Sequence, residues 1–338
     1  MATFEITSMN WKNLAERILA GASIKRDEAL KILKSPDDDL LAVLDGSFAL
    51  RRHYFGRGVQ LHVIRNARSG LCTEDCAYCS QSAKAAGKKE KYPLQSVDEL
   101  VDGAQSAHSM GAVRYCIVTS GRGPKEDELR IVSEAAKKIK GRFNIQICAS
   151  LGSISKKQAQ TLKDAGIDRF NHNLETSARF FSNICSTHTY KDRLRTVMAV
   201  KAAGLELCCG GLIGMGESLE DRVDLAFAMR EVDADSIPVN FLDPRPGTRL
   251  AALKRISARD ALRALSMFRF VNPDREIRVA GGREACLGAL QALALFAANS
   301  IFTNGYLTTG GQGYQADLAM IESAGFHISG TSESPPED

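Results

Sequence analysis

The chain has 338 residues, in which 44 lysines and arginines face 40 aspartates and glutamates, and its formal net charge is +4. The basic residues are scattered, which argues against nucleic-acid binding, and no stretch approaches the roughly 18 consecutive apolar residues of a membrane span. Nine cysteines and an N-terminal segment with early acidic residues and little arginine predict a cytoplasmic protein that uses its thiols for metal or redox chemistry.

Three helical patterns come first in the chain, and residues 1–55 are expected to form a helical N-terminal extension. The patterns cover residues 11–19, 26–33 and 40–54, and the last is opened by Ser35, Pro36 and Asp37 as cap and first turn. The acidic, proline-bearing segment 325–338 is predicted to be a disordered tail.

Between these ends, short β-rich runs alternate with longer amphipathic stretches. The expected strands are 60–65, 113–119, 143–149, 167–173, 206–213, 236–241, 276–279 and 300–303. The expected helices are 97–110, 126–140, 155–165, 191–203, 219–232, 258–270 and 283–297. This alternation predicts an α/β fold with a parallel sheet, and eight strands predict a (β/α)8 TIM-type barrel over residues 56–324.

Three cysteines follow the first expected strand with the spacing C-x3-C-x2-C: Cys72, Cys76 and Cys79. Three thiolates can hold a cubane [4Fe-4S] cluster and leave its fourth iron open to a small molecule. The spacing also allows a structural zinc site or unrelated core cysteines, although no fourth ligand follows at zinc-finger spacing. Because barrel enzymes react at the carboxyl ends of their strands, this loop is expected at the active face.

A second group of candidate ligands is spread over separate expected strands. Cys116, Cys148 and Cys208 each lie in a different strand, and side chains at alternate strand positions point into a barrel. Arg278 lies in another strand, where a buried arginine needs an anionic partner such as a cluster with thiolate ligands. Packing cysteines and a structural ion pair are the alternative interpretation.

Polar residues at the end of a further expected strand form a third group. Asn171, Asn173 and Glu175 alternate and therefore share one face, where amides and a carboxylate suit hydroxyl and ureido groups. The alternative is that Asn173 or Thr176 caps a following helix.

Residues 69–82, SGLCTEDCAYCSQS, resemble the biotin synthase family of radical S-adenosylmethionine (SAM) enzymes, and the similarity continues over almost the whole chain. The resemblance implies a sulfur-inserting enzyme that converts dethiobiotin to biotin, with no catalytic residues beyond its cofactors. Hydrogen abstraction by a radical derived from SAM would precede sulfur donation by a second cluster.

The resemblance also implies roles for the residues named above and for Tyr78 and Asn240. The [4Fe-4S] ligands would be Cys72, Cys76 and Cys79, and the [2Fe-2S] ligands Cys116, Cys148, Cys208 and Arg278. SAM would be bound by Tyr78, Asn173 and Glu175, and dethiobiotin by Asn173 and Asn240.

The remaining features of the sequence concern partners and three further cysteines. The resemblance implies a homodimer. The basic run Lys84, Lys88, Lys89 and Lys91 is typical of a solvated surface, and the alternative interpretation is a docking site for an acidic electron donor such as flavodoxin. Cys185, Cys209 and Cys286 have no predicted role, although Cys209 should point away from Cys208 and Cys286 should pack in the core. Other functions compatible with the sequence are another radical SAM enzyme of this fold and a non-catalytic iron-sulfur sensor or scaffold.

Overall fold

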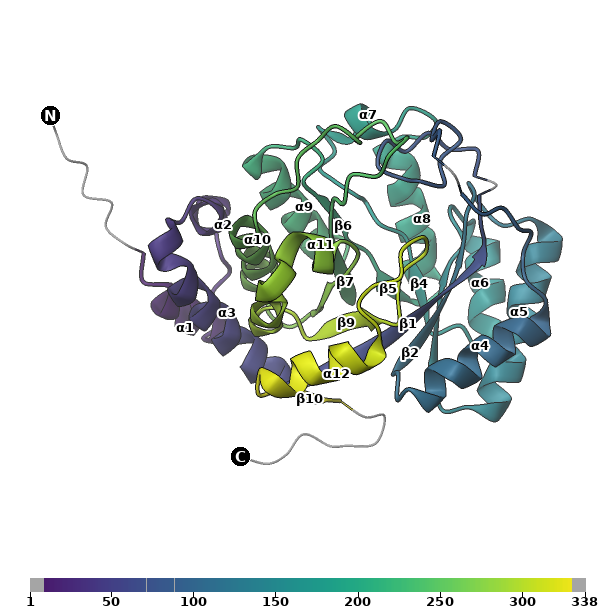
Figure 1. The fold of residues 1–338 in the computed structure, drawn as a ribbon, viewed down its shortest axis with the longest axis horizontal. Coiled ribbons are helices and arrows are strands. Elements are labelled where there is room, and N and C mark those ends of the chain that lie inside the picture. The colour runs from purple at the N-terminus through teal and green to yellow at the C-terminus, as the bar shows by residue number, and fades with distance from the viewer. Residues whose placement is uncertain (1–8, 71, 88, 330–338) are drawn as a thin grey trace, which may run out of the picture.

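A computed structural model describes residues 9–70, 72–87 and 89–329 of the chain (Figure 1). It begins with α1 (Trp11–Leu19), α2 (Arg26–Leu33), the 3-10 turn η1 (Asp37–Asp39) and α3 (Leu40–Phe55). α1 and α3 approach closely at Gly46, where an added Cβ would lie 2.8 Å from the carbonyl oxygen of Trp11. Figure 1 shows these helices to one side of the barrel, next to α10 (Ala258–Val271).

Parallel strands form the centre of the molecule. They are β1 (Gly58–Arg68), β2 (Arg114–Thr119), β3 (Gln146–Ser150), β4 (Arg169–Asn171), β5 (Glu206–Cys208), β6 (Gly211–Ile213), β7 (Ser236–Phe241), β8 (Glu276–Val279) and β9 (Ser300–Thr303). β9 pairs with β1, and β5 and β6 follow one another along β7, so within the described residues these strands close into an eight-position barrel. The predicted (β/α)8 fold is confirmed.

The expected strand 206–213 is interrupted between β5 and β6. At Gly210, an added Cβ would lie 2.0 Å from the carbonyl oxygen of Pro238, so only glycine allows the two backbones to approach this closely. The regular strand therefore ends at Cys208 and resumes at Gly211.

Helices cover the outside of the barrel (Figure 1). They are α4 (Val97–Ser109), α5 (Glu126–Arg142), α6 (Lys156–Asp164), α7 (Phe181–Ile184), α8 (Tyr190–Ala202), α9 (Leu219–Glu231), α10, α11 (Arg283–Leu287), the 3-10 helix η2 (Gly288–Phe296) and α12 (Tyr314–Ser323). Several of these helices begin with a capping box, in which two residues cap each other. At the start of α4, the Ser96 hydroxyl accepts from the Glu99 amide, and the Glu99 carboxylate accepts from the Ser96 amide.

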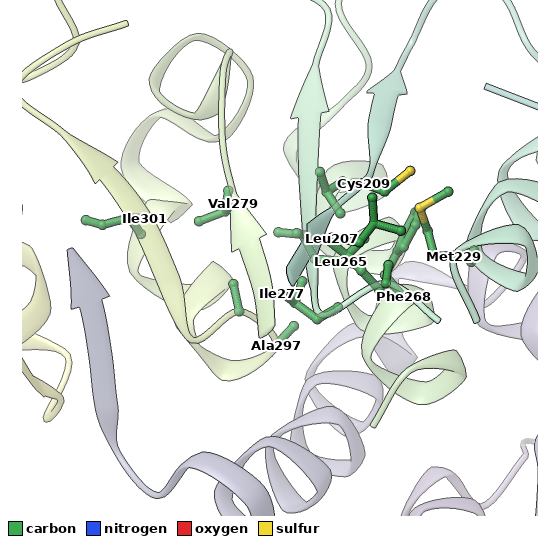
Figure 2. Close-up of a cluster of buried hydrophobic side chains, with 14 of the residues drawn as sticks. Leu207, Cys209, Met229, Leu265, Phe268, Ile277, Val279, Ala297 and Ile301 are labelled. Atoms are coloured by element: carbon green, nitrogen blue, oxygen red, sulfur yellow. The ribbon is translucent and has the colours of Figure 1, made fainter. Parts of the chain in front are cut away.

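The apolar core lies between the strands and these helices. Figure 2 shows Ile277 and Val279 of β8 in this layer together with Leu265 and Phe268 of α10. Cys209 belongs to the same core and is fully buried, whereas Cys208 lines the barrel interior. The two neighbouring cysteines therefore point to opposite faces, as strand alternation predicts.

Several boundaries differ from those expected. The predicted helix 283–297 is divided into α11 and η2 at Gly288, and α7 and α12 were not predicted. Within the predicted tail, β10 (His327–Ile328) pairs with β1, so ordered chain continues past residue 324. The remainder of that prediction, residues 330–338, lies outside the described residues.

Candidate active site

The loop that follows β1 carries Cys72, Cys76 and Cys79, all with free thiols and all partly exposed. The three residues line one cavity of about 200 Å³, called here the outer cavity. The structure therefore brings the motif cysteines together around a single space at the carboxyl end of the barrel strands.

Acidic side chains hold this loop against the chain after α7. Asp75 accepts hydrogen bonds from the Ser186 amide at 2.9 Å and the Ser186 hydroxyl at 2.5 Å, and Glu74 accepts from the Thr187 hydroxyl at 2.7 Å. Burial opposes ionisation of Asp75, but the bonds from Ser186 hold the pKa of its carboxyl below the usual range. Both carboxylates are thus fixed as acceptors, and the backbone between the cysteines cannot move freely.

Cys116, Cys148 and Cys208 line a second cavity of about 370 Å³ inside the barrel, called here the inner cavity. Cys116 and Cys148 are direct neighbours on β2 and β3. A hydrogen bond from Cys148 lowers the pKa of Cys116, and the same contact raises the pKa of Cys148, which also contacts Cys208. The three thiols predicted to converge from separate strands do so.

Arg278 reaches the same group of thiols from β8. It is 2% exposed, its Nη1 lies 3.7 Å from the Cys208 sulfur, and its Nη2 donates to the Ser236 hydroxyl at 3.0 Å. Its Nε has no hydrogen-bond partner among the described residues. The guanidinium thus lies beside the three thiols, and its Nε–H remains available to donate a hydrogen bond.

Sequence reasoning missed the ionic network beneath these thiols. Glu276 is buried and forms ion pairs with Arg278, with Arg169 at 2.5 Å and with Arg114 at 3.3 Å, and Arg169 also pairs with Glu206 at 2.7 Å. Burial would raise the pKa of the Glu276 carboxyl, but the positive charges of Arg278 and Arg169 hold it well below its usual range. Three guanidinium groups face two carboxylates, so the network carries a surplus of one positive charge next to the thiols.

His62 completes this network from β1. Its Nε2 lies 3.3 Å from a Glu276 oxygen and 3.5 Å from Arg278 Nη2. Burial and the positive charge of Arg278 lower the pKa of His62, so the imidazole is neutral at physiological pH.

Asn171, Asn173 and Glu175 line both cavities, so the two spaces meet at these residues. Asn173 Oδ1 accepts from Asn171 Nδ2 at 3.1 Å and from the Gly210 amide at 3.2 Å, which fixes the side chain and leaves its Nδ2 donor for a ligand. Glu175 has a φ of 70°, a strained conformation for a residue with a side chain. All three residues line the same cavities, although β4 ends at Asn171, so Asn173 and Glu175 reach this position from the segment after the strand and not by strand alternation.

The capping alternative for this segment was wrong. Phe180 occupies the cap position of α7, and Thr189 caps α8 with its own side chain. Asn173 and Thr176 therefore start neither of the helices that follow them.

Tyr78 and Asn240 both line the inner cavity, as expected for ligand-binding residues. Burial raises the pKa of Tyr78 well above its usual value, so its phenol stays protonated. The Asn240 amide accepts from the Gly281 amide at 2.9 Å and donates to the Gly211 carbonyl at 3.1 Å. Its orientation is thereby fixed by the backbone of two neighbouring segments.

The remaining unassigned cysteines lie in different environments. Cys286 belongs to the apolar core and its thiol contacts the Leu242 carbonyl at 3.6 Å, in agreement with the predicted packing role. Cys185 lies beside the cysteine loop, with its sulfur 4.0 Å from that of Cys76. Sequence spacing gave no signal for this pair, because 109 residues separate its members.

Residues 68–229 match the radical SAM superfamily, and residues 238–327 match the biotin and thiamin synthesis associated domain. A biotin synthase from Salinibacter ruber is 52% identical over 316 residues, which cover 94% of this chain and 88% of that protein. A biotin synthase from Bacillus subtilis is 47% identical over 323 residues, covering 96% of each chain.

The chain belongs to the biotin synthase family. Because the family is a radical SAM family, its chemistry uses a [4Fe-4S] cluster and SAM. The solved structure of methylornithine synthase superposes with a TM-score of 0.82 and 19% identity, covering 94% of this chain and 97% of that one. The hydrogenase maturase HydG from Carboxydothermus hydrogenoformans gives a TM-score of 0.79 with 16% identity, covering 95% and 80%. These two similarities concern the fold. Among the described helices, none has the length and apolar character needed to cross a bilayer.

Proposed function

We propose that this chain inserts a sulfur atom between two saturated carbons of dethiobiotin to form biotin, with each of its two cysteine groups holding a separate iron-sulfur cluster. The observation that carries the proposal is the arrangement of the two cavities. Each is lined by its own three free thiols, and the two cavities share Asn171, Asn173 and Glu175.

Cys72, Cys76 and Cys79 would hold the [4Fe-4S] cluster. They fit it because three free thiols surround one cavity, and because a three-thiolate donor set leaves one iron open. With SAM bound, this cluster supplies the radical that takes hydrogen from saturated carbons, which acid-base chemistry cannot activate. Tyr78, Asn173 and Glu175 would bind and orient SAM where the two cavities meet.

Cys116, Cys148, Cys208 and Arg278 would hold the [2Fe-2S] cluster, whose sulfide would enter the product. The fit rests on the charge of the network below: its surplus positive charge and the unpartnered Arg278 Nε favour an anionic group at the thiols. Because Glu276 holds Arg278 through its guanidinium, the arginine would balance charge and position the group rather than move a proton.

Asn173 and Asn240 would orient dethiobiotin in the inner cavity, because amides can both donate to and accept from a ureido ring. The barrel wall around them is largely apolar, with Ile64, Leu212 and Phe302 in the lining. Such a wall excludes water from the reacting carbons.

We also propose a homodimer, a cytoplasmic location and reduction by an acidic donor such as flavodoxin. A reducing compartment keeps the thiols available. Lys84 and Lys91 are exposed near the cysteine loop and offer positive charge for docking, whereas Lys89 Nζ donates to the Ser82 carbonyl at 2.5 Å. Lys88 lies outside the described residues.

The decisive experiment traces sulfur from the reconstituted clusters into biotin. The protein is reconstituted anaerobically with iron and isotopically labelled sulfide, freed of unbound sulfide, and incubated with SAM, reductant and dethiobiotin. We expect labelled biotin in the first turnover and 5'-deoxyadenosine as the SAM product. SAM cleavage without biotin would favour another radical SAM activity, and cluster absorbance without SAM cleavage would favour a sensor or scaffold. Unlabelled biotin, with cluster exchange excluded, would overturn the role of the second cluster as sulfur donor.

A further inference from the structure

Cys185 and His188 contact the loop that carries Cys76, and they have no part in the proposed reaction. The Cys185 sulfur is 4.0 Å from the Cys76 sulfur and 3.7 Å from His188 Nε2. A ligand atom from each of Cys76, Cys185 and His188 lies within 4.8 Å of the others. We call these three residues the sulfur-imidazole group.

The spacing of the sulfur-imidazole group fits one tetrahedral metal ion. For zinc, bonds of about 2.3 Å to sulfur and about 2.0 Å to nitrogen place two sulfurs about 3.8 Å apart and a sulfur and a nitrogen about 3.6 Å apart. The distances between Cys76 and Cys185 and between Cys185 and His188 Nε2 are close to both values. The Cys185 sulfur also lies 3.3 Å from His188 Nδ1, so it sits beside the ring and away from the lone-pair direction of Nε2. The imidazole must therefore turn before one ion can contact all three side chains.

Glu74 contacts the imidazole on its Nδ1 side. Its Oε2 lies 2.6 Å from His188 Nδ1, and the same oxygen accepts from the Thr187 hydroxyl at 2.7 Å. A carboxylate that accepts from one ring nitrogen fixes the tautomer and leaves the other nitrogen free to bind metal, an arrangement common around zinc. Nε2 of His188 is thus the available ligand atom.

An ion can reach the sulfur-imidazole group, and binding it would break few existing contacts. Cys76 and His188 line the outer cavity, through which an ion and its fourth, exchangeable ligand can enter. Asp75 Oδ1 lies 3.3 Å from the Cys185 sulfur, and this contact would be lost when the thiol ionises and binds metal. Asp75 would keep its bonds from the Ser186 amide and hydroxyl, so the loop remains held.

We infer that the protein, when it lacks its [4Fe-4S] cluster, binds one thiophilic divalent cation such as Zn²⁺ through Cys76, Cys185 and His188. The inference rests on the proposed function in one respect: Cys76 is also a proposed cluster ligand. One thiolate cannot serve both sites, so the cation and the cluster exclude each other, and a bound cation delays cluster assembly.

The first test titrates the full chain, stripped of clusters under anaerobic conditions, with Co²⁺ as the spectroscopic probe. We expect thiolate-to-cobalt charge-transfer absorption that saturates at about one equivalent, with the visible bands of a tetrahedral site. Cys185→Ala and His188→Gln should each weaken Co²⁺ binding at least about tenfold, because each removes one of three ligands. Circular dichroism checks that each variant is folded, and Cys185→Ser serves if the alanine variant is not.

The matched control is Cys79→Ala, which removes a motif thiol but leaves the sulfur-imidazole group complete. We expect this variant to bind Co²⁺ as the wild type does, and Cys286→Ala, a change at a distant core cysteine, to do the same. The inference is overturned if Cys185→Ala leaves the absorption unchanged while Cys79→Ala removes it, because the motif cysteines alone would then hold the ion.

The second test measures whether a bound cation slows assembly of the cluster. The stripped chain is loaded with Zn²⁺ and then reconstituted with iron and sulfide, and the return of cluster absorbance is followed. Zn²⁺ should slow the wild type about tenfold and leave the rate of Cys185→Ala unchanged, in line with its weaker binding. Equal slowing of both proteins would contradict the inference. A chain that shows the expected Co²⁺ pattern but makes no biotin would contradict the proposed function and leave the cation site standing.

Discussion

The two cysteine groups differ in what holds them. The outer three cysteines lie within eight consecutive residues of one loop. This loop is held in place by Asp75, which accepts from the Ser186 amide, and by Glu74, which accepts from the Thr187 hydroxyl. The inner three lie on three separate strands, whose backbone pairing sets their positions. The outer three cysteines are partly exposed, whereas the inner three are buried. The outer group therefore suits a site where SAM comes and goes, and the inner group suits a sulfur source shielded from water.

The largest expected effect comes from the outer group, since all chemistry starts there. Replacing Cys72, Cys76 or Cys79 by alanine removes one of three ligands, and we expect each variant to form no 5'-deoxyadenosine and no biotin. Chromatography of the products of an anaerobic reaction measures both. A variant that cleaves SAM at the wild-type rate would show that the missing cysteine is no ligand.

A change in the inner group should separate the two activities. We expect Cys148→Ala to bind SAM, to keep its [4Fe-4S] spectrum and to cleave SAM slowly, but to form no biotin, because only the sulfur source is damaged. Arg278→Lys should keep some turnover, since arginine is a poor metal ligand and its charge is preserved. Loss of SAM binding in Cys148→Ala would show that the two groups are not independent.

The difference between the two cysteine groups also explains which of their features could be predicted from the sequence. The outer cysteines were found from their local spacing. Strand alternation in a closed barrel allowed the inner cysteines to converge but also allowed them to be packing residues, and the ligand roles came from the resemblance. The expected strand 206–213 was too long, because the approach of Gly210 to Pro238 depends on a contact between strands.

The Glu276 network could not be predicted in this way. Glu276 is 162 residues from Arg114 and 107 from Arg169, and each looks like an ordinary charged residue at the start of a strand. Only barrel closure brings them together. The same holds for Cys76 and Cys185, whose contact depends on how the loop after β1 lies against the segment after α7. A buried arginine without a partner in the sequence, such as Arg278, was the one available signal.

Rigidity of the inner group can be tested through Glu276. Removing its charge with Glu276→Gln leaves buried guanidinium groups short of an anion, and we expect a loss of about 3–5 kcal/mol in the free energy of unfolding. The matched change Glu206→Gln removes a carboxylate from the same network at a side chain that is 44% exposed, against 7% for Glu276, and should cost at most about 1 kcal/mol. Urea denaturation of the cluster-free proteins measures both. Equal losses would mean that the network is solvated and not a rigid support.

The smallest expected effect lies where the two groups meet. Asn173→Ala removes a fixed amide from the boundary between the cavities, and we expect binding of SAM, dethiobiotin or both to weaken about tenfold, the size of one good hydrogen bond. Equilibrium binding to the reconstituted protein under anaerobic conditions measures each ligand. Asn183→Ala is the control, because Asn183 is an exposed amide on α7 that lines neither cavity. If Asn173→Ala and Asn183→Ala bind both ligands equally well, Asn173 only supports the backbone at Gly210, and the boundary between the two groups must be formed by other residues.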